Sequence, residues 1–168
     1  MHVSVLYKEV IGGLQPQPGG CYIDGTVGAG GHAFGILEAS SPDGELLGLD
    51  LDPAALQVAA ERLKLFGDRA HLVHSSYRDM ASAASRLGWD AADGIVLDLG
   101  LSALQLDTAG RGFAFKHNGP LDMRFDPASP LTAHDLVNGA SEGELADILF
   151  RYGEERAARR IARTIVAA

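Results

Sequence analysis

The chain has 168 residues, 46% of them hydrophobic, and a formal net charge of −8. This is enough for one buried core, and no segment is long and apolar enough to span a membrane. The N-terminus shows no secretory signal and Cys21 is the single cysteine, so the sequence predicts a cytoplasmic protein without an internal disulfide. The acidic balance argues against nonspecific nucleic-acid binding. It permits a local basic surface, because residues 151–168 hold five arginines against two glutamates.

The first hundred residues alternate predicted strands with predicted helices. An amphipathic opening helix over Val5 to Leu14 comes first, and strands are then predicted at 21–24, 45–50, 71–74 and 94–98. The last of these is an unbroken apolar run, which is typical of a strand buried on both faces of a parallel sheet. We therefore predict an α/β fold with a doubly wound, mostly parallel sheet over residues 1–100.

A glycine-rich turn, DGTVGAGGH over residues 24–32, directly follows the first predicted strand. Such a turn predicts a nucleotide-type cofactor site, because glycines adopt positive φ and let a ligand approach the main chain. Gly28-x-Gly30-x-x-Ala33 also fits the dinucleotide fingerprint, and Asp50 lies where a ribose-binding acid is expected. The pattern leaves NAD and S-adenosylmethionine open, since both present a ribose diol to such an acid.

Periodicity is lost between residues 101 and 131, where aromatics, glycines and charges are mixed. This composition favours an ordered active-site loop over a linker. From Thr132 the sequence turns helical, with Thr132 and Ser141 as candidate caps and one long helix predicted over 154–166. Four arginines share a face of that helix, which is either a solvated face or a phosphate-binding surface. They are Arg156, Arg159, Arg160 and Arg163.

Read in order, the motifs of the chain resemble the bacterial 16S ribosomal RNA cytosine-N4 methyltransferases, which use S-adenosylmethionine. The motifs are HVSVL at 2–6, the glycine turn at 24–32, DLDP at 50–53, LDLG at 97–100, QLD at 105–107, RGF at 111–113, GPLDMR at 119–124 and YGEE at 152–155. The resemblance spans essentially the whole chain. It implies a Rossmann-like class I methyltransferase fold, with the start of an inserted helical domain over 132–168.

Members of that family continue well past Ala168. The resemblance therefore implies an N-terminal portion with an incomplete sheet, exposed apolar surface and self-association, including a homodimer. One departure lies after the fourth strand, where the family's Gly-Val-Ser-Ser-Pro-Gln reads GLSALQ over 100–105. Without the proline, the loop that places Gln105 is looser.

The resemblance also implies a set of S-adenosylmethionine contacts. Main-chain groups of Gly30, Gly31 and His32 would line the methionine end, and Asp50 would accept both ribose hydroxyls. Tyr77 would lie against the adenine, and Asp98 and Gln105 would close the far side. Asp98 is in addition the candidate catalytic acceptor for the protons of the cytosine amino group. No metal is required, because the positive charge of the sulfonium disappears on transfer.

The implied substrate is the N4 amino group of a cytidine in the decoding region of small-subunit RNA, free or in the assembled subunit. Loop residues Arg111, Lys116 and Arg124, together with the four C-terminal arginines, are the predicted RNA contacts. No membrane partner is expected. Two alternatives remain: an NAD-dependent oxidoreductase, which would lack a Tyr-x-x-x-Lys arrangement, and a noncatalytic cofactor-binding fragment.

Overall fold

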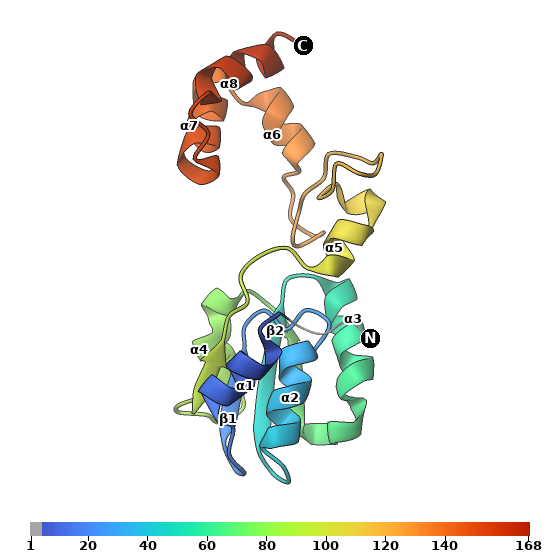
Figure 1. Ribbon diagram of the computed structural model, residues 1–168, viewed down its shortest axis with the longest axis vertical. Coiled ribbons are helices and arrows are strands. Elements are labelled where there is room, and N and C mark those ends of the chain that lie inside the picture. Colours follow the sequence, from blue (N-terminus) through green and yellow to red (C-terminus); the bar gives the residue numbers. More distant parts are fainter. Residues whose placement is uncertain (1–4) are drawn as a thin grey trace. The chain divides into compact units, whose positions relative to one another are not determined.

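In the computed structural model, which describes residues 5–168, the chain divides into two compact units, residues 1–102 and 103–168 (Figure 1). His2 and Val3, which belong to the first motif of the family resemblance, lie outside the described residues. Within the described part of the chain, no helix is long and apolar enough to cross a membrane.

The first unit is built on a parallel sheet in the order β3-β2-β1-β4. Its strands are β1 (Cys21–Asp24), β2 (Glu45–Asp50), β3 (Ala70–His74) and β4 (Gly94–Val96). The predicted α/β fold with a parallel sheet is thus confirmed. The order reverses between β1 and β4, and open α/β sheets bind ligands at the carboxyl ends of the strands beside such a switch point.

Side chains of each strand point alternately to the two faces of this sheet. Both faces therefore carry apolar side chains, and helices cover both (Figure 1). Tyr22 and Leu46 face a core formed with three helices, whereas Ile23 and Leu47 face a second core against one. The three are α1 (Tyr7–Leu14), α2 (Gly31–Ala39) and α3 (Pro53–Leu63); the single one is α4 (Met80–Arg86). Two 3₁₀ turns, η1 (Lys64–Arg69) and η2 (Tyr77–Asp79), flank β3.

Local sequence signals explain how α2 and α3 begin. Asp52 caps α3 by accepting a hydrogen bond from the backbone N–H of Ala54 at 3.0 Å, and Pro53 occupies the first helical position. Gly30 precedes α2 with a φ of 76°. A Cβ at Gly30 would lie 3.3 Å from Cα of Ala59, so this glycine also lets α2 pack closely on α3.

The fourth strand differs from its prediction. It ends at Val96 rather than Asp98, and Ile95 and Leu97 are 48% and 41% exposed instead of buried on both faces. The reason is its position, because β4 pairs with β1 and lies at the edge of the four-stranded sheet. An apolar run alone does not distinguish an edge strand from a central one.

The second unit contains a loop-rich segment followed by three helices. Its elements are α5 (Ala103–Asp107), η3 (Ala109–Arg111), α6 (Ala133–Gly139), α7 (Glu142–Gly153) and α8 (Ala158–Val166). Thr132 and Ser141 both form the predicted caps, each in a reciprocal capping box with the acid three residues on. Leu145 and Ala146 of α7 pack with Ala162 of α8 in a small core of their own.

The predicted long helix over 154–166 is wrong at its start. Glu154 adopts a left-handed conformation, with φ 51°, and ends α7, so α8 begins only at Ala158. The side chain of Glu155 accepts a hydrogen bond from the backbone N–H of Ala157 at 2.6 Å, which satisfies one of the donors left open at the new helix start. Arg156 therefore precedes α8.

Candidate cofactor site

The glycine turn lies across the carboxyl ends of three neighbouring strands. The backbone N–H of Val27 donates to Leu49 O at 3.0 Å, and that of Gly25 donates to Val96 O at 2.9 Å. The turn is thereby tied to β2 on one side and to β4 on the other. A Cβ at Gly25 would lie 2.5 Å from Cδ2 of Leu97 and 2.9 Å from Cβ of Tyr77, so only glycine fits there.

Asp50, the last residue of β2, is held by the same turn. Its Oδ2 accepts a hydrogen bond from the backbone N–H of Gly28 at 2.8 Å, and its Oδ1 accepts one from the backbone N–H of Asp52 at 2.9 Å. A carboxylate oxygen has two lone pairs, so each oxygen retains one for a further donor. Gly28 has a φ of 51°, and a Cβ there would meet only Thr26 O within 4 Å, at 3.8 Å. The turn is therefore open beside an oriented carboxylate.

Asp98 lies two residues beyond β4, and its side chain is exposed. Its backbone N–H donates to Oγ1 of Thr26 at 2.7 Å. This hydrogen bond fixes the segment after β4 against the glycine turn. Thr26 was missed as a functional candidate, although its position two residues after a strand-ending aspartate, inside the turn motif, was visible in the sequence.

Asp24, the last residue of β1, is 1% exposed and was also missed. Its Oδ1 accepts a hydrogen bond from the backbone N–H of Thr26 at 3.2 Å. Burial is the main reason why the pKa of Asp24 is raised to about 6, with smaller effects from Asp50 and Asp98 that raise it and from His32 that lowers it. The pKa of Asp24 is therefore sensitive to charges on β2, α2 and the segment after β4.

The other predicted cofactor residues occupy different surroundings. His32 is buried in the first turn of α2, next to Gly31, with Nε2 3.0 Å from Val5 O and its ring stacked on Tyr7. Tyr77 is half-buried in η2, after β3. Gln105 is buried in α5 and belongs to the second unit. The first unit thus brings Asp50, Tyr77 and Asp98 to the edge of the sheet where the turn lies.

Two of the predicted RNA contacts have structural partners. The guanidinium of Arg124 binds Asp122 through Nε at 3.0 Å and Nη2 at 2.7 Å, and its Nη1 donates to the carbonyls of Pro127 and Ser129 at 2.9 and 2.8 Å. Four of its five N–H donors are thereby used. Nη2 of Arg111 donates to the carbonyls of Arg124 and Phe125 at 2.7 and 3.0 Å. These side chains therefore organise their own loop, and the contact of both with RNA stays a prediction.

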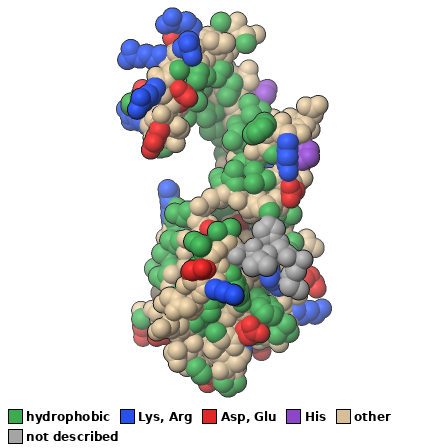
Figure 2. Space-filling model, in the orientation of Figure 1, with side chains coloured by type: hydrophobic (Ala, Val, Ile, Leu, Met, Phe, Trp, Pro, Cys, Tyr) green, Lys and Arg blue, Asp and Glu red, His purple; other side chains and the backbone are tan. Residues whose placement is uncertain are grey.

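The remaining predicted RNA contacts are exposed. Lys116 Nζ lies 2.9 Å from Oδ1 of Asp107. The four C-terminal arginines are exposed, and Arg163 Nε lies 3.3 Å from Oε1 of Glu142 on α7. Figure 2 shows Lys and Arg side chains gathered over α7 and α8 in the second unit. The basic surface is therefore present, with Arg163 already paired to an acid.

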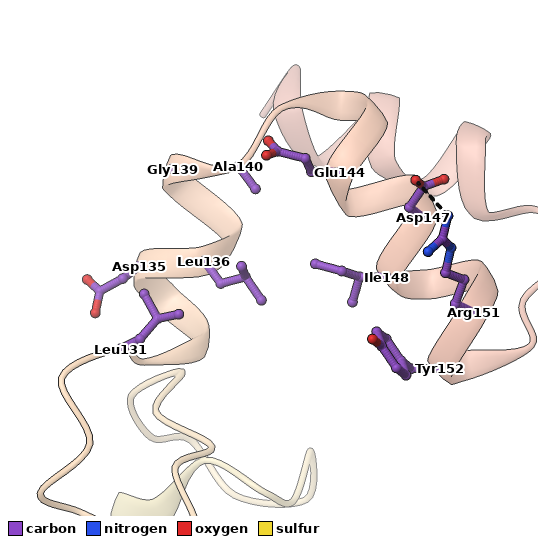
Figure 3. Close-up of a pocket in the computed structure, with 10 residues that line it drawn as sticks. All are labelled: Leu131, Asp135, Leu136, Gly139, Ala140, Glu144, Asp147, Ile148, Arg151 and Tyr152. Atoms are coloured by element: carbon purple, nitrogen blue, oxygen red, sulfur yellow. Dashed lines mark ion pairs between the residues drawn. The ribbon is translucent and has the colours of Figure 1, made fainter.

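A groove of about 520 Å³ lies between α6 and α7 in the second unit (Figure 3). Leu136 of α6 and Ile148 of α7 point toward each other across it, and an ion pair of 3.8 Å joins Asp147 and Arg151 at its side. None of the predicted site residues lines this groove. Among residues 5–168, no cluster of three or more His, Cys, Asp or Glu side chains is arranged to hold a metal ion.

Comparison with known proteins identifies relatives along the whole chain. A model of the MraW methylase family matches residues 1–168. The proteins named ribosomal RNA small subunit methyltransferase H of Geotalea uraniireducens and Geobacter sulfurreducens are 54% and 55% identical to it. These matches cover 98% and 99% of the chain but 53% and 54% of the relatives. The chain therefore spans about half the length of the curated relatives it matches.

Among solved structures, the crystal structure of PH0851 matches with a TM-score of 0.51 and 20% identity. The match covers 60% of this chain and 22% of that one, and it shows a likeness of fold alone. The family match is to methylases, so the oxidoreductase alternative gains no support from it.

Proposed function

The chain belongs to the MraW methylase family, and from this premise we propose that its first unit binds S-adenosylmethionine at the glycine turn. The observation that best supports this proposal is the carboxylate of Asp50, which is oriented by Gly28 and keeps a free lone pair on each oxygen. A carboxylate with both oxygens available suits the two hydroxyls of a ribose. The open space at Gly28 suits a ligand that approaches the main chain.

The proposed contacts follow the residues at the carboxyl edge of the sheet. Asp50 holds the ribose and the half-buried Tyr77 offers a flat face to the adenine. Main-chain groups of Gly30, Gly31 and His32 line the methionine end. The buried His32 ring, bound to Val5 O, serves to fix the start of α2. When bound, S-adenosylmethionine supplies a methyl group activated by its sulfonium charge.

We propose further that the methyl acceptor is the N4 amino group of a cytidine in small-subunit ribosomal RNA. The name of the relatives, ribosomal RNA small subunit methyltransferase H, supports this substrate class. The amino nitrogen is a weak nucleophile while it is conjugated with the ring, and an acceptor for its protons raises its reactivity. Asp98 is the proposed acceptor, since its side chain is exposed at the carboxyl end of β4. Holding the nitrogen in line with the methyl group is the main catalytic effect.

Two assays on the 168-residue chain test these proposals separately. Thermal-shift titration with S-adenosylmethionine, S-adenosylhomocysteine and NAD tests the cofactor, and stabilisation by the first two but not by NAD is expected. Incubation with labelled S-adenosylmethionine and unmethylated small ribosomal subunits, followed by nucleoside analysis, tests the transfer. Detection of N4-methylcytidine would show that the chain is an active methyltransferase. Cofactor binding without any transfer identifies a cofactor-binding fragment instead.

A further inference from the structure

Phe115 is the most exposed large hydrophobic side chain in the described part of the chain, with a relative exposure of 106%. It lies in the loop between η3 and α6 of the second unit. An aromatic ring in contact with water loses a large favourable burial term. The neighbouring aromatic side chains of the loop do not share this exposure, since Phe113 packs on Phe125 with ring centroids 5.3 Å apart and lies under the guanidinium of Arg111.

The loop that presents Phe115 is closed at its base. The backbone N–H of Met123 donates to Arg111 O at 3.0 Å, which joins the two sides of segment 112–122. A Cβ at Gly112 would lie 2.8 Å from the backbone N of Asp122, and one at Gly119 would overlap the carbonyl of Ala109. These close approaches and the hydrogen bonds of Arg124 hold the base of the loop, so Phe115 is presented from an ordered support.

Lys116 is the cationic residue next to the ring, in a loop whose charges balance. Residues 107–126 hold three cationic residues against three acids, namely Arg111, Lys116 and Arg124 against Asp107, Asp122 and Asp126. Asp122 is bound by Arg124. Lys116 follows Phe115 directly, and its ion pair with Asp107 is more than half exposed on both sides, at 55% and 70%. Exposed pairs contribute little stability, so a phosphate can compete for this ammonium group.

We propose that Phe115 stacks on an unpaired base of the RNA substrate, while Lys116 binds a neighbouring phosphate. An exposed aromatic ring beside a cation is the combination with which proteins bind single-stranded nucleic acid. Single-stranded RNA is favoured over a protein partner because the exposed ammonium group of Lys116, which directly follows Phe115, can exchange its carboxylate partner for a phosphate. This inference rests on the proposed RNA substrate and adds a specific binding residue to it.

The test compares the wild type with four variants in binding a short unstructured RNA oligonucleotide taken from small-subunit RNA, and binding is followed by fluorescence anisotropy. Phe115→Ala should weaken binding about tenfold, because base stacking on an aromatic ring is lost. Phe115→Trp should keep the affinity, and its added indole emission should be quenched on stacking. Leu131→Ala is the matched control, since it removes another exposed apolar side chain of the same unit, 57% exposed, and should change nothing.

Lys116→Ala separates the two proposed contacts. It should lower the slope of log affinity against log salt by about one, whereas Phe115→Ala should leave that slope unchanged. If the wild type binds the RNA and Phe115→Ala binds it with the same affinity, the stacking inference is overturned and the proposed RNA substrate is not. Loss of self-association in Phe115→Ala, with RNA affinity unchanged, would assign the ring to a protein interface. Absence of RNA binding by the wild-type chain would overturn both proposals.

Discussion

The backbone N–H of Asp98 donates to Oγ1 of Thr26 across 2.7 Å and so joins the segment after β4 to the glycine turn. Two residues further along that turn, Gly28 holds the carboxylate of Asp50. The residue proposed to bind the ribose and the residue proposed to accept the amino protons are therefore both positioned by a stretch of three residues. A substitution at Thr26 should therefore affect the proposed site without removing Asp50 or Asp98.

Thr26→Val replaces the hydroxyl by a methyl group of similar size and removes this acceptor. A net hydrogen bond contributes about 0.5–1.5 kcal/mol, so S-adenosylhomocysteine affinity should fall roughly two- to tenfold. Amide exchange at Asp98 should accelerate in the same variant. Thr26→Ser retains the hydroxyl and is the control. Equal affinity and equal Asp98 exchange in the valine and serine variants would show that the bond does not position the site.

The buried carboxyl of Asp24 makes stability depend on pH. Its folded-state pKa is raised from 3.8 to about 6, so this group favours the folded state while it is protonated. The favourable contribution is complete below pH 3.8 and is lost as the pH rises through about 6. A shift of about two pKa units corresponds to roughly 3 kcal/mol.

Asp24→Asn removes this titration and can still accept the hydrogen bond from Thr26. Urea unfolding measured across this pH range should show the wild type losing roughly 3 kcal/mol relative to Asp24→Asn. Asp43→Asn is the control, because it removes an acidic side chain that is exposed in the folded chain. If the stability difference between wild type and Asp24→Asn does not vary with pH, the carboxyl does not titrate as described.

Arg124 is expected to stabilise the loop of the second unit locally. Lys in its place cannot make four hydrogen bonds in a planar arrangement. Arg124→Lys should therefore speed amide exchange at Met123, Ala133 and His134, whose N–H groups bond to carbonyls within residues 111–122. Hydrogen-exchange mass spectrometry provides the measurement. The helices α7 and α8 have their own core and serve as the internal control. Unchanged exchange across the loop would contradict the role given to Arg124.

The exposed arginines of α8 should act on RNA and not on the cofactor. Replacing Arg159 and Arg160 by glutamine should lower the salt dependence of RNA binding by about one unit for each phosphate that is no longer neutralised. Arg163→Gln should have a similar effect, because its ion pair with Glu142 is exposed and a phosphate can compete for the guanidinium. Binding measured at several salt concentrations tests these effects. An identical slope in the double variant would show that Arg159 and Arg160 lie on a solvated helix face that does not bind RNA.

The α/β architecture was predictable because its signals are local. Strand patterns, the cap at Asp52 and the capping boxes at Thr132 and Ser141 each depend on residues a few positions apart. The exposure of Ile95 was not predictable, since it depends on where β4 lies in the sheet. The helix end at Glu154 was missed because a left-handed glutamate has no composition signal of its own.

The site was predictable to the extent that the turn motif specified it. Asp50 was placed by its distance from the glycines, whereas the contribution of Thr26 depends on a hydrogen bond to a residue 72 positions away. The hydrogen bonds by which Arg111 and Arg124 organise their loop were missed for a related reason. A positive charge in a loop indicates a phosphate contact only when its donors are not used by the loop itself, and the sequence does not show that.

The measurement that tests the central claim most directly is calorimetric titration of S-adenosylhomocysteine into the wild type, Asp50→Asn and Asp50→Ala. Two charge-assisted hydrogen bonds, each worth roughly 1.5–3 kcal/mol, should be lost in Asp50→Ala, which weakens binding roughly a hundred- to ten-thousandfold. Asp50→Asn keeps one acceptor oxygen and should lie between the two, with NAD binding none of the three proteins. If Asp50→Ala binds S-adenosylhomocysteine as tightly as the wild type does, the account is contradicted. It is also contradicted if the wild type binds NAD and not S-adenosylhomocysteine.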